Sequence, residues 1–510
     1  MPQTGDPFRF RGLFREVPAT VWMLTGAFLS LLLLHAALTP LYRAPDEARH
    51  VDQVLHLREG DGYPPPGREV LTQQVLGSYV ISGYATPDPA KPVGNRATLP
   101  LRRADAPDLG GAPAFKDVPS PTPPQAQLNQ MTQHPPLYYA VGAAVLWVIP
   151  HDAHLPFPWV IGILRLYSIA CVGLLPLLAF NAARRLGIAA APVAAAVPFA
   201  IPQLAHIGSS VTNDSLLIGT MSLLTVALTF VATGDLAKRT AVYVGLIAAA
   251  ALFTKAFALA AVPWIVIAYG IALYRTRSRL AVGGLIVAGA TSALGGWWYV
   301  VNVLRYGKLQ SEETQVAFPK APAGFHPSHT AYLKQFGSQV SQKFWGDFGY
   351  YDLPLPDAFT TTATIVLLAL VVLGTVAVQP RLPGLALLVP VGGIAAIMVV
   401  GTYGLYAKYG TFPGLQGRYL FPALAPVSAL VAAGLGLVAR RFALPAAVVV
   451  AAATQLYGTR FELNGFWSGG LRTVAAWSWY PGPLVYVVTA AAVALVASAA
   501  VVSVKEVRAS

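Results

Sequence analysis

Residues 17–42, VPATVWMLTGAFLSLLLLHAALTPLY, decide the fold class of this chain. The stretch contains no Asp, Glu, Lys or Arg and is long enough to cross a bilayer, for which a helix needs about 20 mostly apolar residues. It is too long for the apolar core of a signal peptide, and no small-residue cleavage site follows it. We therefore predict a first membrane helix that is retained in the protein.

The composition of the whole chain extends this prediction. Of its 510 residues, 55% are hydrophobic and 11% are charged, and the mean hydropathy is +0.56. Soluble domains carry about 25% charged residues, so a soluble globular enzyme and a disordered chain are both excluded. The single cysteine, Cys171, excludes an intrachain disulfide and a cysteine-based metal site. The net charge of +13 is typical of basic residues at the cytoplasmic ends of membrane helices, and we expect no nucleic-acid partner.

Further apolar stretches follow the first along the chain. With it they predict an all-α polytopic membrane protein of about twelve transmembrane helices. The later spans are 155–183, 186–213, 215–234, 240–254, 256–274, 281–304, 358–378, 382–407, 419–439, 442–458 and 482–503. Residues 135–150 (PPLYYAVGAAVLWVIP) are apolar but short, so we predict an interfacial or re-entrant helix there.

Basic residues set the orientation, because Lys and Arg concentrate in short cytoplasmic loops. When the loops alternate, every short basic cluster falls on one side, which places both termini in the cytoplasm. The clusters are Arg9, Arg11 and Arg15; Arg184 and Arg185; Lys238 and Arg239; Arg275, Arg277 and Arg279; Arg381; Arg440 and Arg441; and Lys505 with Arg508. We therefore expect a multi-pass membrane protein whose termini are both cytoplasmic.

This topology divides the chain into tails, spans and outer loops. The predicted segments are a cytoplasmic tail at 1–16, the first helix at 17–42, a long first extracytoplasmic loop with amphipathic interfacial helices at 43–154, helices 2–7 at 155–304, a second outer loop at 305–357, helices 8–12 at 358–503 and a cytoplasmic tail at 504–510. A third outer piece is predicted at about 462–481. Proline between residues 63 and 124 predicts extended, poorly regular structure in the first loop.

An acidic pair, Asp46 and Glu47, directly follows the first helix. Acidic residues in a first turn stabilise a helix through its dipole, and apolar residues at helical spacing follow, which predicts an amphipathic surface helix. The same pair is equally suited to hold a general base at the membrane boundary. His50 lies four residues after Asp46, on the same helix face, where it would either orient that carboxylate or remain a surface histidine.

Three more charged residues lie at predicted outer helix ends. Asp214 stands beside Asn213 and Ser215, which are candidate caps for the fourth span, so a capping role competes with a catalytic one. Lys255 lies at a tight turn between two short spans, where it could meet an anion. Arg418 suits forked contacts with phosphate, with snorkelling to the interface as the alternative; its neighbours Gln416 and Tyr419 belong to the same candidate binding set.

Other candidates are weaker. His134 precedes the short apolar segment, and Arg165 lies within the second span, where it needs a partner. Trp345 lies in the aromatic segment FWGDFGYYDLP, whose residues suit either a membrane aromatic belt or stacking on a sugar. The chain contains no Walker-type loop, HExxH motif or Rossmann fingerprint, so a nucleotide-activated donor has no recognisable binding loop.

The order of seven motifs resembles a known superfamily. They are PDEARH from Pro45, HPPLYY from His134, PQLAHIGSSVTND from Pro202, LFTK from Leu252, GGWWYVVNVLRYGK from Gly295, FWGDFG from Phe344 and QGRYLFP from Gln416. Over about residues 17–430 the chain resembles the GT-C superfamily of membrane glycosyltransferases, including protein O-mannosyltransferases and lipid A aminoarabinose transferases. It looks closest to a bacterial membrane family of unknown function.

The resemblance implies a protein of the bacterial plasma (inner) membrane, a sugar donor linked to polyprenyl phosphate and inverting transfer on the outer face. The acceptor would be a cell-envelope glycan, lipid or protein, and no soluble C-terminal sugar-binding domain is recognisable. The resemblance assigns the catalytic base to Asp46, with Glu47 supporting it and Asp214 as the second acid. It assigns phosphate binding to Arg418 and Lys255, whereas His134 replaces a basic residue of many relatives.

Two questions stay open at this point. Asp46, Glu47 and Asp214 would together suit a divalent cation such as Mg²⁺ or Mn²⁺, but a single-phosphate donor does not require one. A transporter or lipid-linked-substrate flippase would share the twelve spans. Transporters usually show internal repeats and broken helices at the midplane, whereas the polar residues here gather at the outer rim, which favours an enzyme.

Overall fold

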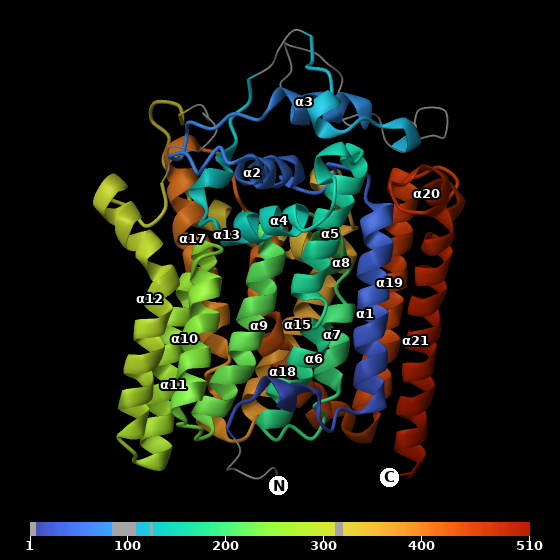
Figure 1. Ribbon diagram of the computed structural model, residues 1–510. Coiled ribbons are helices and arrows are strands. Elements are labelled where there is room, and N and C mark those ends of the chain that lie inside the picture. Colours follow the sequence, from blue (N-terminus) through green and yellow to red (C-terminus); the bar gives the residue numbers. More distant parts are fainter. Residues whose placement is uncertain (1–6, 84–108, 123–125, 312–319, 510) are drawn as a thin grey trace.

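The computed structural model describes residues 7–83, 109–122, 126–311 and 320–509. Long helices run side by side along one axis, and both ends of the described chain lie at the same end of the bundle (Figure 1). Short helices cover the opposite end. Apart from the two-residue strand β1 (Leu353–Pro354), the regular structure of the described ranges is helical.

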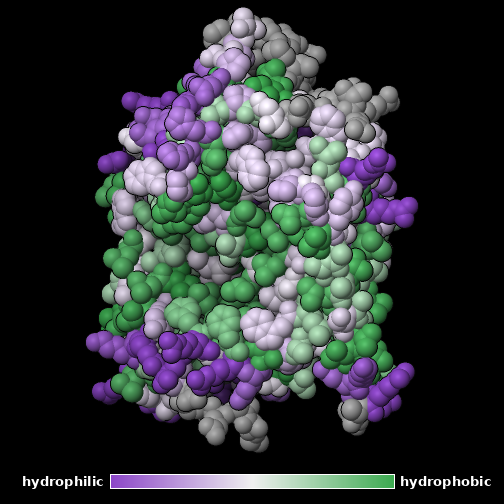
Figure 2. Space-filling view, turned by 45° about the vertical axis from the view of Figure 1, so that its right-hand side comes forward, coloured by the Kyte–Doolittle hydropathy of each residue, from purple (hydrophilic) through white to green (hydrophobic). Residues whose placement is uncertain are grey.

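The bundle confirms an all-α polytopic membrane protein. Within the described residues, nine segments are long and apolar enough to span a membrane, and one of them, Gly417–Phe466, contains two helices. The shorter α10 and the broken pair α7–α8 run beside them (Figure 1), which gives twelve passes. On the face in Figure 2, a broad hydrophobic band lies between hydrophilic ones.

The bundle helices are listed here in chain order: α1 (Ala19–Leu38), α5 (Phe157–Val172), α6 (Leu175–Arg185), α7 (Val193–Phe199), α8 (Pro202–Gly208), α9 (Asn213–Ala232), α10 (Lys238–Leu252), η6 (Ala256–Ala260), α11 (Ala261–Thr276), α12 (Leu280–Tyr306), α15 (Asp357–Ala377), α16 (Arg381–Leu385), α17 (Leu388–Tyr409), η7 (Gly417–Ala423), α18 (Leu424–Ala439), η8 (Arg440–Phe442), α19 (Ala443–Phe466) and α21 (Gly482–Ala509). The helices labelled η are 3-10 helices. Small residues bring neighbouring helices together, as membrane helices require. Gly374 of α15 lies against the backbone of Leu430 in α18, and a side chain at this glycine would overlap it.

The remaining elements lie outside the bundle passes: η1 (Phe10–Phe14), α2 (Glu47–Glu59), α3 (Gln73–Ile81), η2 (Leu109–Gly111), η3 (Phe115–Asp117), η4 (Gln130–Gln133), α4 (Leu137–Trp147), η5 (Asp152–His154), α13 (His329–Trp345), α14 (Phe348–Tyr351), β1 and α20 (Leu471–Trp477). The helices α2 and α4 lie across the upper ends of the bundle in Figure 1. The apolar segment 135–150 thus contains an 11-residue helix that is too short to span.

Several expectations need correction. The predicted span 186–213 is broken into α7 and α8, because Pro202 cannot continue the preceding helix. The predicted outer piece at 462–481 begins too early, because α19 continues to Phe466 and buries Glu462. The proline-rich part of the first loop is not irregular throughout, since it contains α3. Residues 84–108, 123–125 and 312–319 of the predicted loops lie outside the described residues.

Candidate functional site

Four charged residues from four separate segments meet at the end of the bundle opposite the chain termini. Asp46 precedes α2, Asp214 lies in the first turn of α9, Lys255 lies between α10 and η6, and Arg418 lies in η7. We call these four residues the ion-pair cluster. The helix α2 lies across the upper end of the bundle (Figure 1), and Asp46 directly precedes it.

The ion-pair cluster alternates acid and base. Arg418 Nη2 lies 3.1 Å from Asp46 Oδ2, and Arg418 Nε lies 3.6 Å from Asp214 Oδ2. Lys255 Nζ lies 2.6 Å from Asp214 Oδ1. Asp46 is the most exposed member, with 13% of its side chain accessible. Two carboxylates and two cations balance each other, which is what allows four charges to be buried together.

Polar and aromatic neighbours contact three members of this cluster, Asp46, Arg418 and Lys255. Tyr350 donates a hydrogen bond of 2.7 Å to Asp46 Oδ1, and Arg49 Nη1 lies 3.3 Å from the same oxygen. Arg418 Nε donates to Gln416 Oε1 at 2.6 Å. The ring of Tyr419 lies 5.0 Å from Lys255 Nζ and 5.6 Å from the guanidinium of Arg418. The predicted neighbours Gln416 and Tyr419 therefore contact the cations of the cluster.

The conformations of the two acids argue against simple helix capping. Asp46 adopts a left-handed conformation with φ 61°, and its side chain makes no capping hydrogen bond to α2. In α9 the cap is Thr212, whose hydroxyl accepts a hydrogen bond from the backbone N–H of Asp214. The expectation that Asn213 or Ser215 caps this helix is wrong. Both carboxylates are thus directed at cations instead of at their own helices.

The charges around Asp46 control its protonation. Burial by itself raises the pKa of a carboxyl. The guanidinium groups of Arg418 and Arg49 outweigh burial and hold the pKa of Asp46 well below its usual range. Asp46 is therefore ionised in this state, and its oxygens are occupied by donors. A base in this position accepts a proton only after at least one of those donors moves away.

Two histidines near the cluster are neutral. Burial lowers the pKa of His50 to about 3 and holds the pKa of His134 well below its usual range. His50 Nδ1 lies 3.0 Å from the hydroxyl of Tyr139, and this hydroxyl also accepts a hydrogen bond from Asn213. Because neither ring carries a charge, Arg418 and Lys255 are the cations of the ion-pair cluster.

The side chain of Glu47 has different partners from that of Asp46. Its Oε1 and Oε2 accept hydrogen bonds of 2.8 and 2.7 Å from Arg165, and backbone N–H groups of Tyr42 and Val211 donate to them as well. Arg165 also donates to the carbonyls of Ala36 and Thr39 at the end of α1. The partner that Arg165 needs is therefore Glu47, and this pair locks α1 to α5 and α2 without facing the ion-pair cluster.

Trp345 is also placed away from the cluster. Its indole donates to Thr364 of α15 at 2.9 Å, and its ring lines an apolar groove of about 570 Å³ along α7, α15, α18 and α19. Tyr350, from the same aromatic segment, contacts Asp46 instead. Of the FWGDFGYYDLP residues, Tyr350 and not the predicted Trp345 forms a hydrogen bond with Asp46.

Residues 29–427 match the family model described as "Predicted membrane protein (DUF2142)". The chain belongs to this DUF2142 family of predicted membrane proteins. The match contains all four residues of the ion-pair cluster and ends before Glu462. No curated protein matches the chain.

Solved structures provide a second comparison for this DUF2142 member. The chain is similar to ArnT from Cupriavidus metallidurans, solved bound to undecaprenyl phosphate, with 14% identity, a TM-score of 0.45 and coverage of 95% of this chain and 78% of ArnT. It is also similar to the Archaeoglobus fulgidus oligosaccharyltransferase tethered with an acceptor peptide, with 11% identity, a TM-score of 0.41 and coverage of 90% and 56%.

Sequence reasoning missed a buried network in this DUF2142 member. Glu462 of α19 lies between two histidines, 2.9 Å from His35 Nδ1 and 2.8 Å from His206 Nδ1, and all three side chains are fully buried. The hydroxyl of Thr39 donates to Glu462 at 3.0 Å. This network joins α1, α8 and α19. No local pattern links residues 35, 206 and 462, because their proximity is created by helix packing alone.

The predicted metal ligands do not form one set. Glu47 is held by Arg165, and the oxygens of Asp46 and Asp214 face Arg418 and Lys255, so these positive side chains already provide the charge that a cation would bring. No geometry that the described residues adopt brings the three carboxylates onto one ion. We therefore derive no catalytic step through a metal at the cluster.

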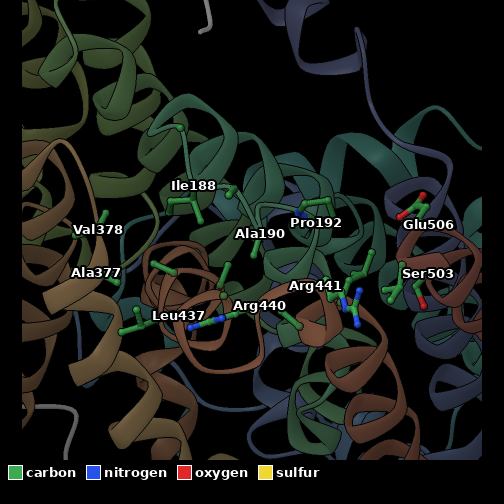
Figure 3. Close-up of a pocket in the computed structure, with 18 of the residues that line it drawn as sticks. Ile188, Ala190, Pro192, Ala377, Val378, Leu437, Arg440, Arg441, Ser503 and Glu506 are labelled. Atoms are coloured by element: carbon green, nitrogen blue, oxygen red, sulfur yellow. The ribbon is translucent and has the colours of Figure 1, made fainter. Parts of the chain in front are cut away.

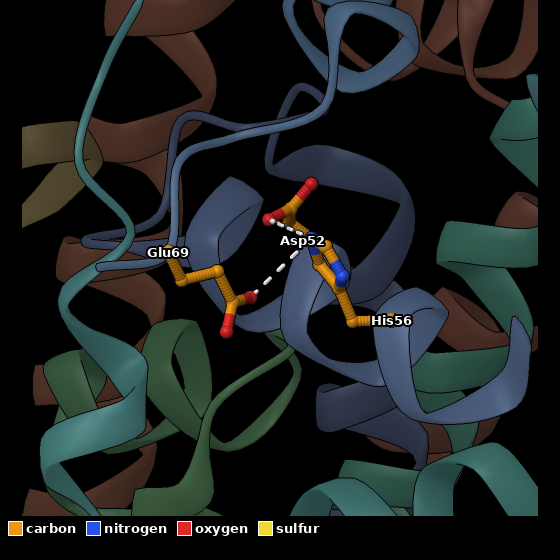
Figure 4. Close-up of side chains that lie close together, drawn as sticks. All are labelled: Asp52, His56 and Glu69. Carbon is orange, nitrogen blue, oxygen red and sulfur yellow. Dashed lines mark ion pairs between the residues drawn. The ribbon is translucent and has the colours of Figure 1, made fainter. Parts of the chain in front are cut away.

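A second group of residues that could ligate a metal lies on α2 and in the segment that follows it (Figure 4). Asp52, His56 and Glu69 place one ligand atom each within 4.8 Å of one another. Hydrogen-bond donors already lie among them, since Asn129 Nδ2 is 2.8 Å from Asp52 Oδ2 and 3.5 Å from Glu69 Oε1. Burial raises the pKa of Glu69 to about 7. His56 Nε2 lies 3.7 Å from Asp52 Oδ2 and 3.4 Å from Glu69 Oε1, so the three side chains contact one another directly.

Proposed function

We propose that this chain is an integral membrane glycosyltransferase. It moves a sugar from a polyprenyl-phosphate-linked donor to a cell-envelope acceptor on the extracytoplasmic face, with inversion at the anomeric carbon. Asp46 is the general base, and Arg418 and Lys255 bind the donor phosphate. The observation that carries the proposal is the ion-pair cluster, because it combines a carboxylate with two cations at one end of a membrane bundle. The order of the seven motifs supports it.

The charge balance of the cluster suggests how the base is activated. In the state described here, Arg418 keeps Asp46 ionised, and the same ion pair prevents the carboxylate from accepting a proton. A donor phosphate carries negative charge and attracts the guanidinium away from Asp46, since Arg forms its strongest contacts with phosphate in a forked geometry. Loss of this neighbour raises the proton affinity of Asp46. Donor binding would thus switch Asp46 from an ion-pair partner to a base.

The proposed reaction balances without a cofactor. The acceptor oxygen attacks the anomeric carbon from the side opposite the phosphate, and its proton passes to the Asp46 carboxylate. The bond between the anomeric carbon and the phosphate oxygen breaks, which leaves a lipid phosphate monoester. Arg418 and Lys255 stabilise the charge that develops on this leaving group. Asp214 keeps both cations in position, because it contacts each of them.

The proposed face of the membrane depends on the charge pattern. The cluster lies at the end of the bundle opposite both chain ends (Figure 1), and the basic clusters predict that those ends are cytoplasmic. Ser120 lies in the first predicted outer loop and is exposed. A Ser120→Cys variant without Cys171 should react with a membrane-impermeant thiol reagent in intact cells. Labelling only after lysis would reverse the proposed orientation.

The function is tested in cells and with purified protein. Mass spectrometry of cell-envelope glycans, with and without the gene, should reveal a sugar that disappears with it. The purified chain in liposomes, given a labelled polyprenyl-phosphate sugar and envelope extract, should transfer the label to an acceptor. Movement of the labelled donor across the bilayer without transfer would support a flippase instead and overturn the proposal.

A further inference from the structure

A cavity of about 610 Å³ lies at the end of the bundle that carries the chain termini (Figure 3). Its volume falls in the range of ligand sites, about 300–1,000 Å³. Its walls come from residues 187–192 between α6 and α7, the end of α15, the last turns of α18, the start of α19 and the last turns of α21. These walls are mainly Ala, Gly, Val, Leu and Pro side chains.

Two arginines stand at this cavity, Arg440 and Arg441 of η8. Both are exposed, and neither guanidinium group forms an ion pair or a hydrogen bond within the part of the chain that the structure describes. The guanidinium of Arg441 lies 5.0 Å from the centre of the Phe442 ring. The cavity therefore combines an apolar interior with two cationic groups that have no anionic partner among the described residues.

The backbone holds both arginines at the cavity. Arg440 has φ 49° and ψ −124°, an uncommon conformation for a residue with a side chain. This turn joins α18 directly to α19 and keeps consecutive arginines in the lining. Three other polar residues line the cavity, namely Gln379, Ser503 and Glu506. Glu506 is the one acidic group among the lining residues, and it forms no ion pair with either arginine in the described ranges.

We propose that this cavity binds an anionic phospholipid of the surrounding leaflet. Its phosphate would contact Arg440 and Arg441, and the upper part of its acyl chains would lie on the apolar walls. Basic pockets between membrane helices on the cytoplasmic side bind anionic head groups through this combination of charge and apolar surface. The charge selects an anionic over a zwitterionic lipid, and the apolar walls select an amphiphile over a free phosphate. The proposal is independent of the sugar-transfer function.

The test compares two double variants that each remove two positive charges at the same end of the molecule. Arg440→Gln with Arg441→Gln removes the cavity arginines. Arg277→Gln with Arg279→Gln removes two exposed arginines between α11 and α12, which do not line the cavity. Binding of phosphatidylglycerol and of phosphatidylcholine to the purified full-length chain in detergent is measured by native mass spectrometry and by titration with fluorescent lipid.

The expected loss is specific to the cavity pair. Phosphatidylglycerol affinity should fall on the order of tenfold to thirtyfold in the cavity variant and remain within about twofold in the control pair. The variant Leu444→Trp, which adds volume to the cavity while keeping both arginines, should weaken phosphatidylglycerol binding as well. Unchanged elution and unfolding temperature confirm that each variant is folded.

Three results would overturn the proposal. Equal losses in the two double variants would show that diffuse surface charge binds the lipid. Equal affinity for phosphatidylcholine and phosphatidylglycerol would show an apolar groove without head-group recognition. Competition by inorganic phosphate at the same site would show a free-phosphate site.

Discussion

Asp46 and Glu47 are neighbours in the sequence and have opposite surroundings in the structure. Every oxygen of Glu47 accepts hydrogen bonds from fixed groups, namely Arg165 and two backbone N–H groups, and its side chain is fully buried. Asp46 is partly accessible, and its partners are the long side chains Arg418, Arg49 and Tyr350. Side chains of this kind can move, whereas the backbone groups around Glu47 cannot.

This difference predicts a structural role for Glu47 and a catalytic role for Asp46. Removing one partner of a fully buried ion pair leaves the other charged and unpaired, which costs folding free energy. Replacing a mobile partner of an accessible carboxylate changes its proton affinity more than the fold. The comparison predicts that substitutions at residue 46 lower activity and substitutions at residue 47 lower stability.

The largest expected effect is the loss of transfer in Asp46→Asn. The amide keeps the shape but cannot accept the proton, and a general base contributes about 10²–10⁴-fold in rate. Transfer of labelled sugar in liposomes should fall by about this factor while the unfolding temperature changes little. Glu59→Gln, an exposed acid on the same helix, is the matched control and should keep full activity. Near-normal transfer by Asp46→Asn would show that Asp46 is not the general base.

Glu47→Gln should mainly destabilise the protein. The change leaves Arg165 buried without its carboxylate, and such losses cost about 3–5 kcal/mol of folding free energy. Unfolding in detergent, followed by circular dichroism against denaturant, measures the cost. The double variant Glu47→Leu with Arg165→Met removes both charges and should recover part of the loss. A stable Glu47→Gln protein without transfer activity would instead make Glu47 part of the catalytic machinery.

Arg418→Lys tests whether the guanidinium geometry of Arg418, and not only its charge, is needed for transfer. The guanidinium contacts Asp46, Asp214 and Gln416 in three directions, which one ammonium group cannot reproduce. Transfer should fall about 10- to 100-fold, and the KM for the donor lipid should rise, because phosphate stabilisation is weakened. Normal kinetics in this variant would mean that Arg418 serves only to anchor η7 at the membrane surface.

Tyr350→Phe gives the smallest expected effect. It removes one hydrogen bond of 2.7 Å to Asp46, and a typical hydrogen bond contributes about 1 kcal/mol. Transfer should therefore change by about tenfold at most, mainly in kcat, and the pH at which activity is half-maximal should shift. A loss as large as that of Asp46→Asn would mean that Tyr350 itself moves the proton.

The membrane passes could be predicted because apolarity is a local property. Most spans reach the length that a bilayer requires, so the average apolarity over a window of residues is sufficient to find them. Errors occur where packing overrides this average. Pro202 breaks a span that reads as continuous, and α19 extends past the predicted end because Glu462 is paired inside the bundle.

The sequence predicted the individual residues of the candidate site but not the contacts between them. Charged residues are rare in membrane segments, so Asp46, Asp214, Lys255 and Arg418 stand out, and the alternating topology assigns them all to one side. The sequence contains nothing that pairs Lys255 with Asp214, or that directs Tyr350 and not Trp345 toward Asp46. These contacts depend on how each helix is rotated about its own axis.

The sequence by itself therefore determined the fold class, the number of passes and the end of the bundle at which the charged residues gather. The tertiary structure alone decided that Asp46 faces Arg418 while Glu47 faces Arg165, and that His35, His206 and Glu462 form one network. The physical reason is the sequence distance over which each interaction acts. The free energy of transferring an apolar segment into a membrane is a sum over neighbouring residues, whereas a buried ion pair depends on the packing of two helices that are far apart in the sequence.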